Sequence, residues 1–258
     1  MRERIVIKVG SNVLTRGDGK LDVTRMSAIV DQIAWLRDKG YDVILVSSGA
    51  VASGRGELQI DHNLDSVEQR QLFSAVGQVK LVGLYYDLFR EFGIHVGQVL
   101  TMKENFEAGE QYENQRACME VMLENGVLPI VNENDTVSVT ELMFTDNDEL
   151  SGLMAEMVKA STLVLLSNID GVYTAHPDDP EAELISRVEA NRDLSEYIKP
   201  ERSAFGRGGM HSKYQTASRL QKAGIRVIIA NGERDNILID LMERPAAVPH
   251  TEFIPICN

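Results

Sequence analysis

Short apolar runs alternate with segments of helical periodicity along most of this chain. Residues 5–9, 43–46, 163–166 and 227–230 are almost entirely apolar, which is typical of strands buried on both faces of a sheet. Between such runs apolar residues recur every three or four positions, as over residues 66–92, and this spacing predicts helices. The alternation predicts an α/β fold, a three-layer αβα sandwich around a mainly parallel open sheet.

Small or polar residues follow the predicted strands. The sets are Lys8, Gly10 and Ser11, then residues 47–54, then Ser167 and Asn168. We expect residues 47–54 to form a loop of small side chains that admits a ligand to the backbone, although a tight strand-to-helix turn would need the same residues. Because ligands of open α/β sheets bind at the carboxyl ends of the strands, we expect a single site at this edge.

Residues 205–213 form a glycine-rich segment that ends in Lys213 and precedes a helical pattern. Glycines let backbone N–H groups approach an anion, and a helix N-terminus favours negative charge. The spacing is not that of a Walker A loop, so by itself the segment fits a flexible turn as well as a phosphate site. Lys8, which could also simply reach solvent, would be a second cation for the same phosphate.

Two acidic clusters, residues 132–135 and 146–148, flank a segment with hairpin-like alternation at residues 137–144. Helix capping explains one aspartate or asparagine but not two clusters. Calcium binding is disfavoured because the EF-hand spacing is missing. The histidines show neither metal-ligand nor triad spacing, and we expect His211 to be a loop residue.

Composition excludes several classes of function. The net charge of −13 argues against a nucleic-acid-binding surface, which is usually basic. Cys118 and Cys257 lie far apart, so neither a disulfide framework nor a zinc site is expected, and Cys118 is expected in the core. The N-terminus has no signal-peptide pattern and no apolar stretch approaches the roughly 20 residues that span a bilayer, which favours a cytoplasmic protein that does not contact a membrane.

The motifs contain lysines and aspartates but no evident general base. Phosphoryl transfer to a carboxylate needs none, because that nucleophile is ionised near neutral pH. It needs positioning, and cations that offset the repulsion between the carboxylate and ATP. Two lysines held by an aspartate would meet this need.

Five motifs together resemble the glutamate 5-kinase family, a branch of the amino acid kinase family. They are Ile7-Lys8-Val9-Gly10-Ser11, residues 47–54 (SSGAVASG), Asn132-Glu133-Asn134-Asp135, Asp146-Asn147-Asp148 and Gly208-Gly209-Met210 through Lys213. The resemblance covers essentially the whole chain in the right order. It implies a single amino acid kinase domain over residues 1–258, with residues 1–160 as the amino-acid lobe and 161–258 as the nucleotide lobe.

The resemblance implies roles for individual residues. Lys8 and Lys213 match the lysines that stabilise the transferring phosphoryl group, and Asp148 matches the aspartate that organises them. The implied glutamate-binding residues are Ser48, Gly49, Ala50, Asp135, Asp146 and Asn147, with Asp135 on the α-ammonium. The implied ATP-binding residues are Lys8, Gly10, Ser11, Ser167, Asn168, Arg207, Gly208, Gly209, Met210, His211, Ser212 and Lys213.

The implied activity is ATP-dependent phosphorylation of the side-chain carboxylate of L-glutamate to L-glutamyl 5-phosphate, the first step of proline biosynthesis. ATP is then the co-substrate, and Mg²⁺ is held mainly by phosphate oxygens rather than by protein ligands. A homo-oligomer (dimer or tetramer) and a partnership with glutamate-5-semialdehyde dehydrogenase are further expectations. Alternatives are a kinase for acetylglutamate, carbamate or a nucleoside monophosphate, and a non-catalytic amino-acid sensor.

The chain departs from the family pattern at three positions. Many members have a threonine-like residue at Arg207, an aspartate at Asn168 and a lysine at Met143. Many also carry a C-terminal PUA domain, which this sequence does not include.

Overall fold

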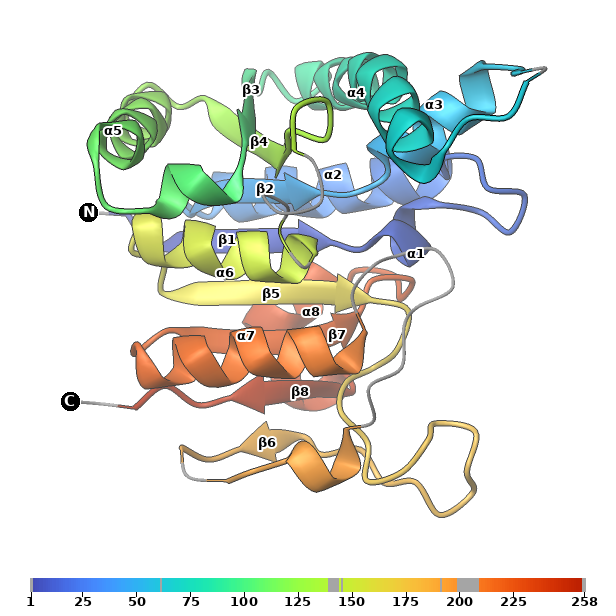
Figure 1. Ribbon diagram of the computed structural model, residues 1–258. Coiled ribbons are helices and arrows are strands. Elements are labelled where there is room, and N and C mark those ends of the chain that lie inside the picture. The colour runs from blue at the N-terminus through green and yellow to red at the C-terminus, as the bar shows by residue number, and fades with distance from the viewer. Residues whose placement is uncertain are drawn as a thin grey trace.

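An eight-stranded sheet forms the centre of the part of the chain that the structure describes (Figure 1). This computed structural model describes residues 2–60, 62–138, 144, 146–190, 192–198 and 209–256. The strands are β1 (Arg4–Val9), β2 (Asp42–Ser47), β3 (Val96–Thr101), β4 (Leu128–Glu133), β5 (Thr162–Ser167), β6 (Arg187–Val188), β7 (Arg226–Asn231) and β8 (His250–Phe253). Their order is β3-β4-β2-β1-β5-β7-β8-β6.

The sheet is mainly parallel, as predicted. β1 lies at its centre and pairs in parallel with β2 and β5, and the antiparallel pairing is that of β7 with β8. The half β3-β4-β2-β1 comes from the chain before residue 160, and the half β5-β7-β8-β6 comes from the chain after it. Every side chain of β1 is buried, which explains its nearly continuous apolar sequence.

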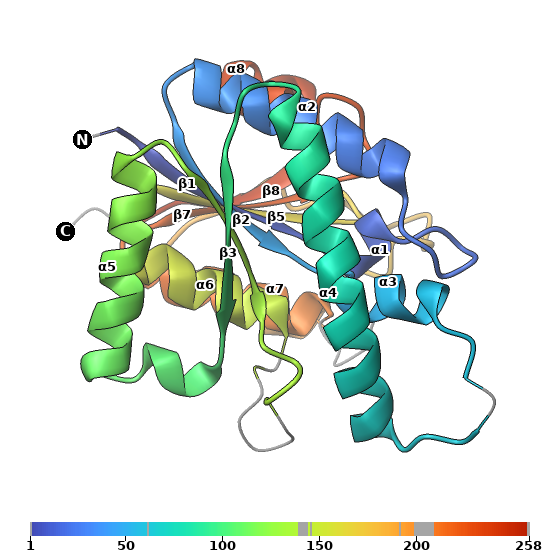
Figure 2. The same cartoon turned by 90° about the horizontal axis from the view of Figure 1, so that it is seen from above.

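Helices cover both faces of the sheet (Figure 2). The helices are α1 (Ser11–Leu14), α2 (Val23–Asp38), α3 (Ala50–Glu57), α4 (Ser66–Arg90), α5 (Glu110–Glu124), α6 (Asn147–Met157), α7 (Met210–Lys222) and α8 (Ile237–Glu243), with short 3-10 turns at Lys103–Phe106, Ser195–Tyr197 and Pro245–Ala247. One core contains the apolar sides of α2, α4 and α8, and the other contains those of α5, α6 and α7. In β1, Ile5 and Ile7 face the first core and Val6 faces the second, as the two-residue repeat of a strand requires. The three-layer sandwich is therefore confirmed.

Helix α4 packs unusually close to α3. A Cβ atom at Gly77 would lie 1.8 Å from the carbonyl oxygen of Ala50, and one at Gly54 would lie 1.9 Å from that of Phe73. Glycine is therefore required at both positions for the two backbones to approach. Gly83, one and a half turns beyond Gly77, has open space around it.

Three local expectations were wrong. Residues 47–54 are a loop only as far as Gly49, because α3 begins at Ala50. Helix α7 begins at Met210, so His211 lies exposed in its first turn rather than in a loop. Cys118 is exposed, because α5 buries only a narrow stripe that contains Met119 and Leu123.

Several expectations lie outside the described residues. They concern Arg207 and Gly208 of the glycine-rich segment, Met143 with most of the expected hairpin, and Cys257. Among the residues that are described, no helix is long and apolar enough to cross a membrane.

Candidate active site

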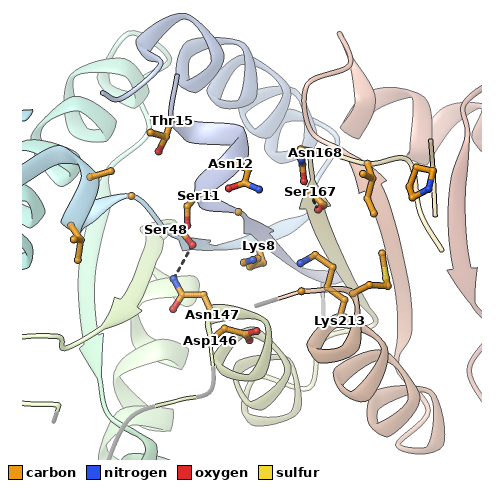
Figure 3. A pocket seen from close by; sticks show the side chains of 18 of the residues that line it. Lys8, Ser11, Asn12, Thr15, Ser48, Asp146, Asn147, Ser167, Asn168 and Lys213 are labelled. Carbon is orange, nitrogen blue, oxygen red and sulfur yellow. Dashed lines mark hydrogen bonds between the residues drawn. The ribbon is translucent and has the colours of Figure 1, made fainter. Parts of the chain in front are cut away.

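A cavity of about 1100 Å³ lies at the carboxyl ends of the central strands (Figure 3). Lys8 and Asn132 each lie one residue before the end of their strands, β1 and β4, Ser48 follows β2 and Ser167 ends β5, and all four line the cavity. The first turn of α7 contributes Lys213 from the opposite side. Residues up to 205 positions apart in the sequence thus meet because parallel strands end at one edge of the sheet.

Asp148 joins the two lysines. Lys8 Nζ lies 2.6 Å from Asp148 Oδ1, and Lys213 Nζ donates a hydrogen bond of 2.9 Å to Asp148 Oδ2. All three side chains are more than nine-tenths buried. Burial alone raises the pKa of Asp148, but the charges of Lys8 and Lys213 outweigh it and lower this pKa to about 2. The group therefore holds two cations and one anion, a net charge of +1, in a water-poor site.

Burial lowers the pKa of Lys8, the opposite of its effect on Asp148. The charge of Asp148 opposes this shift, and the charge of Lys213 reinforces it. Lys8 therefore depends on Asp148 to keep its proton. A further anion placed between the two lysines, such as a phosphate oxygen, would stabilise both charges.

Asp146 lies two residues before Asp148 and caps α6. Its Oδ1 accepts hydrogen bonds from the backbone N–H groups of Asp148 and Glu149, at 2.8 and 3.0 Å. Its Oδ2 is buried without a hydrogen-bond partner in the described part of the chain. Burial, and secondly the charge of Asp148, raise the pKa of Asp146, whereas the nearby hydroxyl of Ser212 opposes the shift. Asp146 lines the cavity, so its free oxygen is available to a ligand.

The substrate side of the cavity contains a network of hydroxyl and amide groups. Asn147 Nδ2 donates to the backbone oxygen of Ser47, to Ser48 Oγ and to Asn132 Oδ1, at 3.0, 3.0 and 3.1 Å. Figure 3 shows the contact between Asn147 and Ser48 at the mouth of β2. Gly49 has a φ of 100° and precedes α3, and residues 49–52 line the cavity. The first N–H groups of α3, which have no partner within a helix, therefore lie at the cavity edge.

Arg70 joins the acidic cluster at the end of β4. Its guanidinium donates to Asp135 Oδ1 from Nε at 2.7 Å and to Glu133 Oε2 from Nη2 at 2.8 Å. Arg70 and Asp135 line the cavity. One guanidinium faces two carboxylates here, so these three side chains carry a net charge of −1.

Sequence reasoning missed Arg70. A signal was present, because Arg70 stands three and seven positions before Phe73 and Gly77 on the buried side of α4. A charged residue in the buried stripe of a helix needs a partner of opposite charge, and the nearby acidic motif could have supplied it.

The predicted nucleotide residues are only partly brought together. Gly10, Ser11, Ser167, Asn168, Gly209, Met210 and Lys213 line the cavity. His211 and Ser212 do not, because they lie on other sides of the first turn of α7. At Gly10 a Cβ atom would lie 3.1 Å from the backbone oxygen of Leu166 and 3.6 Å from Lys8 Nζ, so glycine keeps this approach to Lys8 open.

Several other cavity residues were not predicted. Ile169, Tyr173 and residues 174–177 line the cavity after β5, and Ile198 does so after the 3-10 turn. These side chains are mostly apolar or aromatic and suit a flat ring such as a nucleobase. No spacing rule singles them out, because they lie on irregular loops.

Comparisons with known proteins agree with this architecture. A model of the amino acid kinase family matches residues 3–231. A glutamate 5-kinase of Bacteroides thetaiotaomicron is 63% identical over 252 residues, covering 98% of this chain and 70% of that enzyme. A glutamate 5-kinase of Chlorobaculum tepidum is 47% identical over 236 residues, covering 91% of this chain and 65% of that enzyme. The chain thus spans about two thirds of the length of these relatives.

Two solved structures share the fold. A UMP kinase from Ureaplasma parvum has a TM-score of 0.65 at 19% identity, with 98% of each chain covered. A carbamate kinase from Giardia lamblia has a TM-score of 0.70 at 15% identity, with 99% of each chain covered. At these identities the likeness establishes the fold alone.

Proposed function

Because this chain belongs to the amino acid kinase family and, within it, to the glutamate 5-kinases, we propose that it phosphorylates the side-chain carboxylate of L-glutamate with ATP. The products are L-glutamyl 5-phosphate and ADP, and the reaction is the first step of proline biosynthesis. The observation that carries the proposal is the Lys8–Asp148–Lys213 bridge in the cavity. A binding module for an amino acid would not need two buried lysines held by one aspartate.

Lys8 and Lys213 stabilise the phosphoryl group during transfer. A carboxylate oxygen of glutamate attacks the γ-phosphorus of ATP, the new O–P bond forms as the bond to the β,γ-bridging oxygen breaks, and ADP leaves with that oxygen's electron pair. One lysine about 4 Å from a phosphate charge contributes roughly 4 kcal/mol at an effective dielectric constant of about 20, before desolvation. Asp148 keeps both ammonium groups in place before ATP arrives, which is electrostatic preorganisation.

The opposite end of the cavity would hold the amino-acid portion of glutamate. Asp135 places a carboxylate in the cavity lining, which suits the α-ammonium. The first N–H groups of α3, after Gly49, and the hydroxyl of Ser48 suit the α-carboxylate. The site would therefore select a free amino acid over an N-acylated one.

Mg²⁺ fits this site as an ion held by ATP rather than by the protein. Among the described residues no group of three or more histidine, cysteine or acidic side chains is placed to hold a metal. Asp146 Oδ2, buried and unpaired, would accept a hydrogen bond from a water of the ion's hydration shell. Bound with ATP, magnesium supplies neutralisation of phosphate charge.

The two halves of the sheet would bind different substrates. We assign residues 1–160 to the amino acid, because Ser48, Asn132 and Asp135 come from this half. We assign residues 161–258 to the nucleotide, because Ser167, Tyr173 and Met210 come from the other half. Lys8 and Lys213 face each other across the boundary.

We also propose self-association through α4. Val79 and Tyr86 are 76% and 50% exposed, and with Gly83 between them they form one apolar face at helical spacing.

The acyl phosphate product is a reactive anhydride, so coupling to a glutamate-5-semialdehyde dehydrogenase in the cytoplasm would limit its loss.

Trapping the acyl phosphate tests the proposed function. The chain, ATP and Mg²⁺ are incubated with hydroxylamine and with L-glutamate, N-acetyl-L-glutamate or L-aspartate, and the hydroxamate is measured. We expect hydroxamate from glutamate and little from the other two. Hydroxamate from acetylglutamate but not from glutamate would overturn the assignment, and ATP-independent binding without turnover would favour a sensor.

A further inference from the structure

Gln78 is a buried polar residue of α4 that lies behind the cavity rather than in its lining. It is 8% exposed, and its Oε1 accepts a hydrogen bond of 3.0 Å from Asn132 Nδ2. Its Nε2 is buried without a partner in the described part of the chain. A buried N–H₂ group without a partner destabilises the folded protein. An apolar side chain would avoid this cost, so the contact between the Gln78 oxygen and Asn132 requires an explanation.

Asn132 also contacts Asn147. Asn132 Oδ1 accepts hydrogen bonds from the backbone N–H of Glu133 at 2.9 Å and from Asn147 Nδ2 at 3.1 Å. A backbone N–H can only donate, so it fixes which end of the Asn132 amide is the oxygen. The nitrogen of Asn132 must then point away from Glu133, and Gln78 supplies the acceptor that it meets.

The orientation of Asn147 is fixed in the same way. Its Nδ2 faces the backbone oxygen of Ser47, which can only accept, as well as Ser48 Oγ and Asn132 Oδ1. With its nitrogen surrounded by these acceptors, the side chain has its Oδ1 left for a ligand, and Asn147 lines the cavity. An amide oxygen can only accept, so it suits a donor such as an ammonium group.

We propose that Gln78 is a positioning residue for the amino-acid substrate, acting through Asn132 on Asn147, so that Asn147 presents its oxygen to the substrate ammonium beside Asp135. This inference rests on the proposed function, because it concerns how that substrate is held. The chain of contacts runs Gln78, Asn132, Asn147, from α4 through β4 to the first residue of α6. Removing Gln78 leaves a buried N–H₂ group of Asn132 without an acceptor, so one of the contacts that hold Asn132 against Asn147 is lost.

Replacing Gln78 by methionine tests the proposal, because methionine keeps a similar volume and removes the acceptor. In Gln78→Met we expect the KM for glutamate to rise by about fivefold or more, as for the loss of a buried hydrogen-bond partner. We expect the KM for ATP to stay within about twofold, since the contacts from Gln78 through Asn132 to Asn147 do not include a nucleotide residue. A merely structural role would lower the melting temperature and leave the KM for glutamate unchanged, which would overturn the proposal.

The matched control is Ser74→Ala, one turn away on the same buried side of α4. Ser74 Oγ donates only to the backbone oxygen of Gln71 among the described residues, so its KM for glutamate should equal that of the wild type. A rise as large as in Gln78→Met would show that any polar loss on α4 has this effect, and would also overturn the proposal.

Gln78→Leu is the second variant and serves if the methionine variant does not fold. It also removes the acceptor for Asn132 and adds no charge to this buried position, so we expect the KM for glutamate to rise as in Gln78→Met, by about fivefold or more. A KM for glutamate equal to that of the wild type in a folded Gln78→Leu would overturn the proposal. If the wild-type chain makes no hydroxamate from glutamate, the proposed function fails. If it makes hydroxamate but the Gln78 variants have the same KM for glutamate as the wild type and Ser74→Ala, only the role of Gln78 fails.

Discussion

Two buried ionic clusters stand at different places in the same cavity and carry opposite net charges. Lys8, Asp148 and Lys213 have two cations and one anion, whereas Arg70, Glu133 and Asp135 have one cation and two anions. Burying a charge is costly, so opposite charges meet within each cluster. The majority of cations in the first cluster suits a phosphate and an acceptor carboxylate, and the majority of anions in the second suits an ammonium group.

The cavity is therefore polarised along its length. A substrate with a carboxylate at one end and an ammonium group at the other would match both excess charges at once. Glutamate has this arrangement, and an N-acylated acid lacks the ammonium. The sharpest tests of this view remove the central residue of each cluster in turn and compare the kinetic constants that change.

The largest effect should follow removal of the carboxylate that joins the lysines. In Asp148→Asn the two buried ammonium groups lose their shared partner, and because burial already lowers the pKa of Lys8, a lysine should lose its proton. We expect kcat to fall by about 100-fold or more, equivalent to at least about 2.7 kcal/mol. Asp240→Asn, which removes a buried aspartate paired with Arg244 outside the cavity, should leave kcat unchanged. A kcat within about threefold of the wild type in Asp148→Asn would remove the bridge from the mechanism.

Loss of one lysine should have the next largest effect. Lys213→Ala removes one of the two cations at the phosphoryl group, and we expect kcat to fall by at least about tenfold. Steady-state turnover with glutamate and ATP measures it. Lys222→Ala, in the last turn of the same helix, is the matched control and should retain kcat. An unchanged kcat in Lys213→Ala would mean that the net positive charge of the first cluster does not act on the transition state.

The acidic cluster should instead control binding of the amino acid. In Asp135→Ala the net charge of the second cluster falls from −1 to zero, so the ammonium loses its partner. We expect the KM for glutamate to rise by about tenfold, with the KM for ATP changed by less than about twofold. Initial rates over a grid of both substrates measure the two constants. If the KM for ATP rises and that for glutamate does not, the acidic cluster is not at the amino-acid end.

The smallest effect concerns stability and pH at the two aspartates of α6. The pKa of Asp148 is lowered to about 2, so its contribution to stability is complete above the ordinary aspartate pKa and is lost as the pH falls toward 2. The pKa of Asp146 is raised, so ionising it costs stability as the pH rises above that ordinary value. Asp146→Asn, which retains a good helix cap, should therefore raise the free energy of unfolding at neutral pH by about 1 kcal/mol.

Urea unfolding at several pH values checks this last expectation. The gain in Asp146→Asn should shrink toward about pH 4, where the wild-type carboxyl takes up its proton in the unfolded chain as well. A gain that does not depend on pH would show that the charge of Asp146 is not its cause.

The layers of the fold and the edge at which the site lies could be predicted from the amino-acid pattern alone. The nearly continuous apolar runs at residues 5–9 and 163–166 are typical of strands buried on both faces, and helical segments between such strands favour parallel pairing. Parallel strands place their ends together, so Lys8 and Lys213 could be grouped from their places in the chain, whereas the place of Asp148 between them came from the resemblance to the family. Their types and order also carried the resemblance to the family.

The pairing of those charges depends instead on how the elements pack in three dimensions. Arg70 meets Asp135, and Gln78 meets Asn132, because α4 packs against α3 at the glycine contacts and lies beside β4. No local rule of periodicity or capping links residues more than fifty positions apart on different elements. The residues that line the cavity after β5 were missed for a related reason, because irregular loops have no periodic pattern of apolar residues. Periodicity shows which face of an element is buried, whereas the partner of a buried charge depends on which other element covers it.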